Sequence, residues 1–243
     1  MLNDAGKTVD NFIAEDYLED LKSAVCLIYL DGLNYRFIHR SFQEYFTALY
    51  LKNLDDDLQN KVCNLMIEKQ TLSFQYDSVF SMLRDMSRER FEKNVVLPFF
   101  NEIESHVNSV DRIKSFYCYL VNAIFIHKDL RVPSEYDYNW VFSDRNIFLS
   151  VDFNLKVNVD FIFFLFQKYC HRKQSSLNLE KLFSKYLNVV ITKETINKDS
   201  ALFSKILTET TVGNMIRTFA GLRDKLDKQQ RNAVSEIEAL FEE

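Results

Sequence analysis

Three polar residues with the chemistry of a binding site lie close together near the start of the chain: His39, Ser41 and Glu44. Ser41 and Glu44 have the spacing of a capping box, in which the serine oxygen accepts from the amide three residues later and the glutamate carboxylate accepts from the serine amide. This spacing predicts a helix that begins at or near Ser41. His39 comes just before that helix, where unpaired amides and the helix dipole favour an anion, so its imidazole could donate to a phosphate. The alternative for a lone histidine is a half-buried ring that bonds a neighbouring carbonyl.

The elements that would position His39 are a strand before it and a helix after it. Asp31-Gly32 is typical of a tight turn, and Leu33 to Ile38 alternates apolar and polar residues as a half-buried strand does. After Ser41, apolar residues recur at a spacing that predicts one buried helical face: Phe42, Tyr45, Phe46 and Leu49. An earlier helix is expected from Glu15 to Leu30, with one face formed by Leu18, Leu21, Val25 and Ile28 or Tyr29. A helix, a turn and a strand in this order form the second half of a winged helix.

The run Phe37 to Leu51, FIHRSFQEYFTALYL, closely resembles the end of the winged-helix module and the helix that follows it in NACHT-family signal-transduction NTPases. This group includes NOD-like receptors and bacterial NACHT defence proteins. The resemblance covers about Ala14 to Leu54. It implies that His39 contacts the phosphates of bound ADP and locks the resting state. It also implies a structural motif around that histidine, made of Phe37, Ser41, Phe42, Glu44, Tyr45 and Phe46.

The composition predicts a mainly α protein. The 243 residues include only 4 glycines and 2 prolines, whereas sheets with many turns and phosphate-loop folds need more glycine. The hydrophobic share of 47% and the 22 phenylalanines indicate extensive packed surface and argue against disorder. The net charge of -5, with both signs interspersed, argues against a nonspecific nucleic-acid binder.

Targeting and redox features favour a cytoplasmic protein. The sequence does not begin with a basic segment followed by an apolar run, so no secretory signal is predicted. The most apolar segment, Phe161 to Phe166, is much shorter than the roughly 20 residues that cross a bilayer, so we expect a core helix there and no membrane contact. The four cysteines form no CxxC pair, so we expect reduced, mostly buried thiols and no metal site: Cys26, Cys63, Cys118 and Cys170.

Beyond the resemblance the pattern stays helical as far as His127. The run Asp55-Asp56-Asp57 is expected to cap the helix Leu58 to Lys69, and Pro98 lies near the start of another predicted helix. Three apolar stripes indicate antiparallel helices in a bundle or a short solenoid: Val79, Phe80, Leu83 and Met86; then Phe99, Ile103 and Val107; then Ile113, Phe116, Tyr117, Leu120 and Ile124.

The pattern changes between Leu130 and Val159, where a small β element is expected near residues 147–157. An aromatic group precedes this element, and for it core packing is favoured over partner binding: Tyr136, Tyr138 and Trp140. Helices are expected to resume at about Asp160. The cationic run His171-Arg172-Lys173-Gln174 suits the end of a helix, where it would compensate the dipole.

Two amphipathic helices are expected at the end of the chain, Val212 to Leu226 and Asp227 to Phe241. The second has an apolar stripe for which packing back on the domain is the expected role: Val234, Ile237, Leu240 and Phe241. The predicted domains are residues 1–40, the second half of a winged helix; 41–130, a helical domain; and 131–243, a C-terminal helical, sensor-like module.

No catalytic constellation is recognisable in the sequence. Gly6-Lys7-Thr8 matches only the end of GxxxxGK[ST], because the first glycine of that motif would fall at Met1 and no strand precedes it. No Ser-His-Asp, Cys-His or HExxH pattern is present. This chain alone is therefore expected not to be an enzyme and to hold no cofactor. The resemblance implies an upstream NACHT domain that binds ADP or ATP with Mg²⁺.

The resemblance implies a regulatory function. The chain would couple the nucleotide state to recognition of a trigger and to homo-oligomerisation, and in a bacterial member this would serve antiphage defence. A nucleic-acid-binding winged helix is one alternative, and it is disfavoured because the helix from Glu15 has four acidic residues against Lys22 alone. A helical protein-interaction scaffold is the other alternative; in it the motif is a packing unit and His39 is buried.

Overall fold

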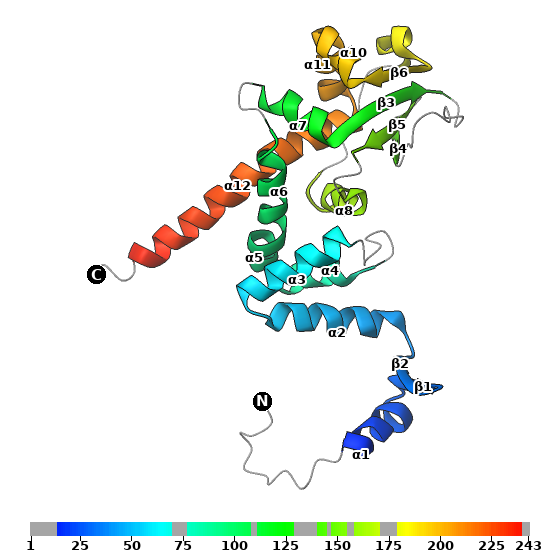
Figure 1. Cartoon of the computed structure of the whole chain (residues 1–243), viewed down its shortest axis with the longest axis vertical. Coiled ribbons are helices and arrows are strands. Elements are labelled where there is room, and N and C mark those ends of the chain that lie inside the picture. The colour runs from blue at the N-terminus through cyan, green and yellow to red at the C-terminus, as the bar shows by residue number, and fades with distance from the viewer. Residues whose placement is uncertain are drawn as a thin grey trace.

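The protein is mainly helical, with a two-stranded hairpin and a four-stranded antiparallel sheet (Figure 1). This confirms the predicted fold class at that level. The hairpin and the first helices form one end of the molecule and the larger sheet lies at the other. The computed structural model describes residues 14–69, 77–107, 111–128, 140–144, 147–154, 158–170 and 179–239.

The first elements are α1 (Ala14–Glu19), the π-helix η1 (Asp20–Ala24), β1 (Ile28–Asp31) and β2 (Asn34–Phe37). The predicted turn and strand are confirmed, because β1 pairs with β2 across a two-residue turn in which Gly32 has a φ of 64°. The prediction that this strand is half-buried is wrong, because its apolar residues Leu33, Tyr35 and Ile38 are 98%, 49% and 54% exposed. The predicted helix as far as Leu30 is wrong beyond Ala24. Cys26 has a φ of 51°, which ends helical geometry, and the residues from Ile28 onward then pair with β2.

Between the hairpin and the larger sheet the described residues form seven helices, and Asp55 caps one of them as predicted. Its carboxylate accepts from the Leu58 amide at 2.8 Å. The stripe from Val79 and the helix near Pro98 are also confirmed. The helices are α2 (Arg40–Asn53), α3 (Asp56–Glu68), α4 (Val79–Met86), α5 (Arg88–Phe91), the π-helix η2 (Glu92–Val96), α6 (Leu97–Glu104) and α7 (Arg112–Leu120).

The larger sheet has the strand order β4-β5-β3-β6, and its strands are β3 (Val121–His127), β4 (Trp140–Asp144), β5 (Ile147–Phe153) and β6 (Val189–Thr192). The small β element predicted near 147–157 is β5. The helix expected to include Ile124 is wrong beyond Leu120, because the next seven residues form β3 between β5 and β6. The boundary expected at residues 130/131 therefore falls between two strands of one sheet.

The chain ends in helices separated by short connections. They are α8 (Val159–Tyr169), α9 (Leu179–Leu182), the 3-10 helix η3 (Ser184–Tyr186), α10 (Lys193–Lys198), α11 (Ser200–Glu209) and α12 (Thr211–Ala239). The two final helices that we expected are one continuous helix, α12, because no proline interrupts residues 211–239 and Gly221, the glycine nearest to Leu226, does not end the helix. Val234 is 53% exposed, so the prediction that this residue packs back on the domain is wrong.

Helix α8 lies in the centre of the hydrophobic core, as predicted for its apolar sequence. Phe161 packs edge-on against Phe99 of α6, with ring centroids 4.8 Å apart. Phe166 packs edge-on against Phe142 of β4, with centroids 5.5 Å apart. Helix α8 therefore joins the helical layer to the sheet in one core.

Several predictions concern residues outside those described. They concern Gly6-Lys7-Thr8, Val9 to Ile13, Tyr136 and Tyr138, the side chain of Trp140, residues 155–157, the run 171–174, the side chain of Ile237, and Leu240 and Phe241.

Candidate functional site

His39 is the N-cap residue of α2, with extended backbone angles of φ -125° and ψ 134°. Its Nδ1 accepts a hydrogen bond from the amide of Ser41 at 3.2 Å and lies 2.6 Å from the Ser41 hydroxyl. The predicted helix start is confirmed to within one residue, because α2 begins at Arg40. The predicted capping box is wrong: the Ser41 amide donates to His39, and the imidazole takes the place of the serine oxygen as the cap.

The cap fixes the tautomer of His39. A backbone amide can only donate, so Nδ1 accepts, and the proton of the neutral ring lies on Nε2. His39 is an exposed residue. Its Nε2–H is therefore a donor at the positive end of a 14-residue helix, the position expected for a group that contacts an anion.

Arg40, beside His39, is engaged by two carboxylates. Its Nε lies 2.8 Å from an Oε of Glu44, and its guanidinium also pairs with Asp77, which precedes α4. Glu44 is only 8% exposed, and it neutralises Arg40 one turn away instead of capping the helix. The positive charge of Arg40 is thus compensated within the chain, and His39 provides a neutral N–H donor beside it for an external anion.

Helix α2 packs with the face opposite to the one we predicted. Glu44, Ala48 and Leu51 are its buried residues. The four residues predicted to be buried are not: Phe42, Tyr45 and Phe46 are 42%, 43% and 41% exposed, and Leu49 is half-buried. The small side chain of Ala48, which is fully buried, suits close packing of this face against α4.

The exposed aromatic rings of α2 are ordered against each other and against the hairpin. Phe46 stacks on Phe37 of β2, with ring centroids 5.6 Å apart, and packs edge-on to Tyr45 at 5.4 Å. We call Phe37, Phe42, Tyr45 and Phe46 the aromatic surface. Most of the exposed large apolar residues that the structure describes are close to it in sequence, eleven of seventeen falling between Tyr17 and Tyr50. An apolar concentration of this kind marks an interaction surface.

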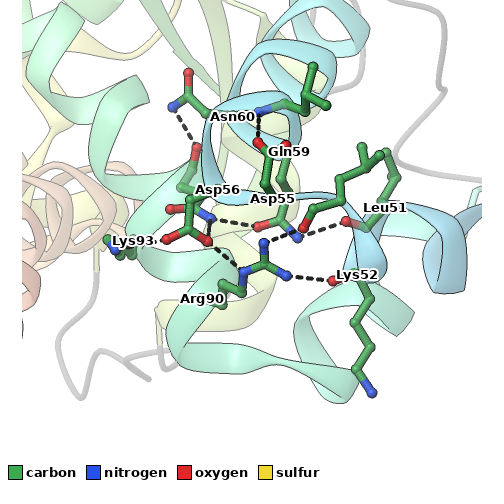
Figure 2. Close-up of polar contacts among 11 residues, drawn as sticks. Leu51, Lys52, Asp55, Asp56, Gln59, Asn60, Arg90 and Lys93 are labelled. Atoms are coloured by element: carbon green, nitrogen blue, oxygen red, sulfur yellow. Dashed lines mark hydrogen bonds and ion pairs between the residues drawn. The ribbon is translucent and has the colours of Figure 1, made fainter.

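A polar network holds the other end of α2 to the helical core (Figure 2). Arg90 of α5 donates to the carbonyl of Lys52 at 2.5 Å and to the carbonyl of Leu54. Its Nε also donates to Asp56 at 2.6 Å. Gln59, which is fully buried, donates to the carbonyl of Leu51 at 2.9 Å. These bonds satisfy carbonyls that the end of a helix leaves unpaired, so α2 is fixed at its C-terminal end.

Asp56 gives this network a pH dependence. Hydrogen bonds from Arg90, Lys93 and Asn94 hold the pKa of Asp56 well below its usual value of 3.8. At pH values above 3.8, the ionised carboxylate of Asp56 thus stabilises the folded state. This stabilisation is lost as the pH falls, because the unfolded state then binds more protons than the folded state.

We expect the urea midpoint of unfolding to fall between about pH 5 and pH 3 in the wild-type protein, and to fall less in Asp56→Asn, which lacks this carboxyl group. Lys93 is the control, since Lys93→Gln leaves the Arg90 contact in place and should keep most of the pH dependence. If the urea midpoint fell by the same amount at low pH in wild type and Asp56→Asn, this role of Asp56 would be contradicted.

The cysteines of the described residues are free thiols: Cys26 is exposed, Cys63 is buried, and Cys118 and Cys170 are half-buried. Burial raises the pKa of the Cys63 thiol to about 12 and that of Cys170 to about 11, so both stay protonated and unreactive. In the described residues, no group of three or more His, Cys, Asp or Glu could hold a metal ion. No helix in that part of the chain is long and apolar enough to cross a membrane.

Some of these contacts could have been found from the sequence. Arg40 and Glu44 have the i, i+4 spacing of a helical ion pair. Arg90 and Asp77 gave no such signal, because their partners lie more than thirty residues away in the sequence. Comparisons with protein-family models, curated proteins and solved structures find no match to this chain.

Proposed function

We propose that this chain is the regulatory C-terminal region of a NACHT-type signal-transduction NTPase. In this proposal, residues up to Ile38 complete a winged helix, and His39 donates from Nε2 to a phosphate oxygen of ADP. An upstream nucleotide-binding domain supplies the P-loop and binds ADP or ATP with Mg²⁺. The rest of the chain responds to a trigger, which in a bacterial member would come from a phage, and the protein oligomerises in the cytoplasm when released.

The observation that carries the proposal is the orientation of His39. A histidine that only packed in a core would be buried, but this one is exposed and uses Nδ1 for its own helix. The remaining Nε2–H of this exposed residue is left as a donor at the start of α2, where a helix favours an anion. The resemblance of residues 37–51 to the NACHT motif supports the same role.

The aromatic surface supports an upstream partner domain. A ring about two-fifths exposed gains from leaving water, by roughly 25 cal/mol for each Å² of apolar surface buried. A domain that packs on Phe42 and Phe46 would cover this surface and bring its nucleotide to His39. Release of the nucleotide would then free His39 from the phosphate and uncover the aromatic surface.

The two ends of α2 support transmission of that change. His39 lies at one end, and at the other Arg90 and Gln59 bind the last carbonyls of the helix. A movement of His39 would therefore be transmitted along α2, because the other end of this helix is bound to the core that contains α8. This is a rigid connection between the nucleotide contact and the trigger-responsive part of the chain.

His39 has two proposed roles, as a helix cap and as a donor to phosphate. Two substitutions in the native-length protein distinguish them. Asparagine is a good N-cap but lacks the Nε2–H, whereas alanine lacks both functions. We expect both His39→Asn and His39→Ala to speed ADP dissociation by about 10–100-fold, the effect of losing a hydrogen bond to a charged group. Only His39→Ala should also lower the free energy of unfolding, by about 0.5–2 kcal/mol.

Stopped-flow release of a fluorescent ADP analogue and urea unfolding measure the two effects. If His39→Asn releases ADP at the wild-type rate, His39 is a helix cap only and the proposed contact is wrong. Ser105→Ala, which alters a hydroxyl near the end of α6, is a control that should leave the dissociation rate unchanged.

A further inference from the structure

Helices α4 and α8 meet at a polar contact beside their buried aromatic rings (Figure 1). Lys168, near the end of α8, donates to the hydroxyl of Ser81 on α4, with Nζ and Oγ 2.6 Å apart. The guanidinium of Arg84, one turn further along α4, lies over the ring of Tyr169 at 5.4 Å from its centroid. Residues three apart are neighbours on a helix, so Lys168 and Arg84 bring two positive charges to one junction. We call Ser81, Arg84 and Lys168 the α4–α8 cluster.

Both cations of the cluster are partly removed from water. The side chain of Arg84 is 15% exposed, and its nearest carboxylate, Asp85, is 3.4 Å away and itself 67% exposed. The Nε of Arg84 is buried and has no hydrogen-bond acceptor among the described residues. Lys168 is half-buried, and within the described part of the chain its ammonium contacts the Ser81 hydroxyl and the face of Phe164 but no carboxylate. Burying a charge costs free energy unless an opposite charge compensates it.

The one nearly buried carboxylate at this junction is already engaged. Glu92 of η2 is 8% exposed, and one of its oxygens accepts from Nε of Arg88 at 2.8 Å and from the Tyr169 hydroxyl at 3.0 Å. The contacts of the described residues therefore join three basic side chains to two acidic ones: Arg84, Arg88 and Lys168 to Asp85 and Glu92. One positive charge is left to be balanced by an anion from outside the chain.

The free donors of the cluster suit a phosphate group. The Ser81 oxygen accepts from Lys168, so the hydroxyl still has its own hydrogen to donate. Lys168 carries three N–H donors and uses one of them for Ser81. A phosphate group has close to two negative charges and at least three strong acceptor oxygens, and both lysine and arginine are typical of the sites that bind it.

We propose that the α4–α8 cluster binds a phosphate group. Lys168 and Arg84 supply the compensating charge, and the Ser81 hydroxyl donates a third hydrogen bond. Free phosphate and a phosphate ester offer the same chemistry to these three side chains. Because the donors come from two helices, the bound anion also strengthens the contact between α4 and α8.

Titration of the full chain with inorganic phosphate at constant ionic strength, followed by amide chemical shifts, tests the proposal. We expect the amides of Ser81 and Lys168 to shift with a Kd of about 1 mM. Lys168→Gln should weaken this binding by about tenfold or more, the effect of losing a hydrogen bond between charged groups. Arg84 is largely buried, so Lys168→Gln and Ser81→Ala are the variants to use, and circular dichroism checks that both fold.

Two controls separate this site from others. Lys225→Gln removes the same charge from an exposed position of α12 and should bind phosphate like wild type. His39→Ala removes the proposed nucleotide contact and should also leave the shifts of Ser81 and Lys168 unchanged. O-phosphoserine, titrated in parallel, distinguishes the sources: tighter binding than phosphate indicates an ester, and equal or weaker binding indicates the free ion.

Three results would overturn the proposal. The first is a wild-type protein whose Ser81 and Lys168 amides do not shift up to about 20 mM phosphate. The second is Lys168→Gln that binds as tightly as wild type. The third is an equal loss of binding in Lys168→Gln and Lys225→Gln, because overall charge and not the cluster would then hold the anion.

Discussion

Replacement of Phe161 by alanine is expected to lower the free energy of unfolding by about 3–5 kcal/mol. The ring is fully buried, lies edge-on to Phe80 at 6.0 Å and to Phe99 at 4.8 Å, and stacks with Phe164 at 5.8 Å. Its removal leaves a cavity that close-packed neighbours fill only in part. Since a domain is stable by about 5–15 kcal/mol, this single change removes a large share.

The same variant tests whether the chain unfolds as one unit. Phe161 belongs to residues 131–243 and its partners Phe80 and Phe99 belong to 41–130, so its loss should weaken both parts together. Urea unfolding can be followed by circular dichroism and by the fluorescence of Trp140, the only tryptophan in the sequence and the first residue of β4. The two probes should give coincident transitions.

Phe163→Ala is the matched control for this experiment. Phe163 lies on the same helix and is only half-buried, so we expect a loss of at most about 2 kcal/mol. Separate transitions for the two probes, or equal losses in the two variants, would contradict the picture of one core centred on α8.

Local signals in the sequence predicted much of the fold correctly. The dipeptide Asp31-Gly32 predicted the hairpin turn, because glycine adopts the positive φ that the turn needs. Asp55 predicted the start of α3, and the nearly continuous apolar run from Phe161 predicted a central helix. Each of these features depends on residues within about one turn of the chain.

The packing face of α2 could not be predicted in the same way. Its sequence has an aromatic stripe, and burial of large apolar residues is the usual expectation. The structure instead buries Ala48 and Leu51 with Glu44, whose charge is compensated by Arg40. The partner that made this possible, Asp77, lies 37 residues from Arg40, and periodicity does not report such distant pairs.

The secondary structure of the segment that forms β3 also could not be predicted from local periodicity. Leu120 and Ile124 continue a helical spacing, but the chain switches to a strand at Val121. Its partners, Val151 in β5 and Ile191 in β6, both pair with Ile124 and come later in the sequence. Pairing between distant segments overrides local periodicity here.

Phe46→Asp is expected to have the largest effect on the proposed nucleotide switch. Within the chain the ring is 41% exposed and stacks on Phe37, so the fold should lose only about 1–2 kcal/mol. In the native-length protein, the proposed contact with the nucleotide-binding domain buries this position, and an unpaired carboxylate there costs about 3–5 kcal/mol. The ADP-held state should therefore weaken by about 100-fold or more.

Gln43→Asp is the matched control, because it adds the same charge to an exposed position of α2 outside the aromatic surface. It should leave nucleotide retention unchanged.

The most direct test of the proposed switch is the amount of ADP released when the native-length protein is purified and denatured. We expect about one ADP per chain for wild type and Gln43→Asp, and little for Phe46→Asp, because Phe46→Asp no longer holds the resting state. Wild-type protein that releases no nucleotide, or Phe46→Asp that retains as much ADP as wild type, would contradict it.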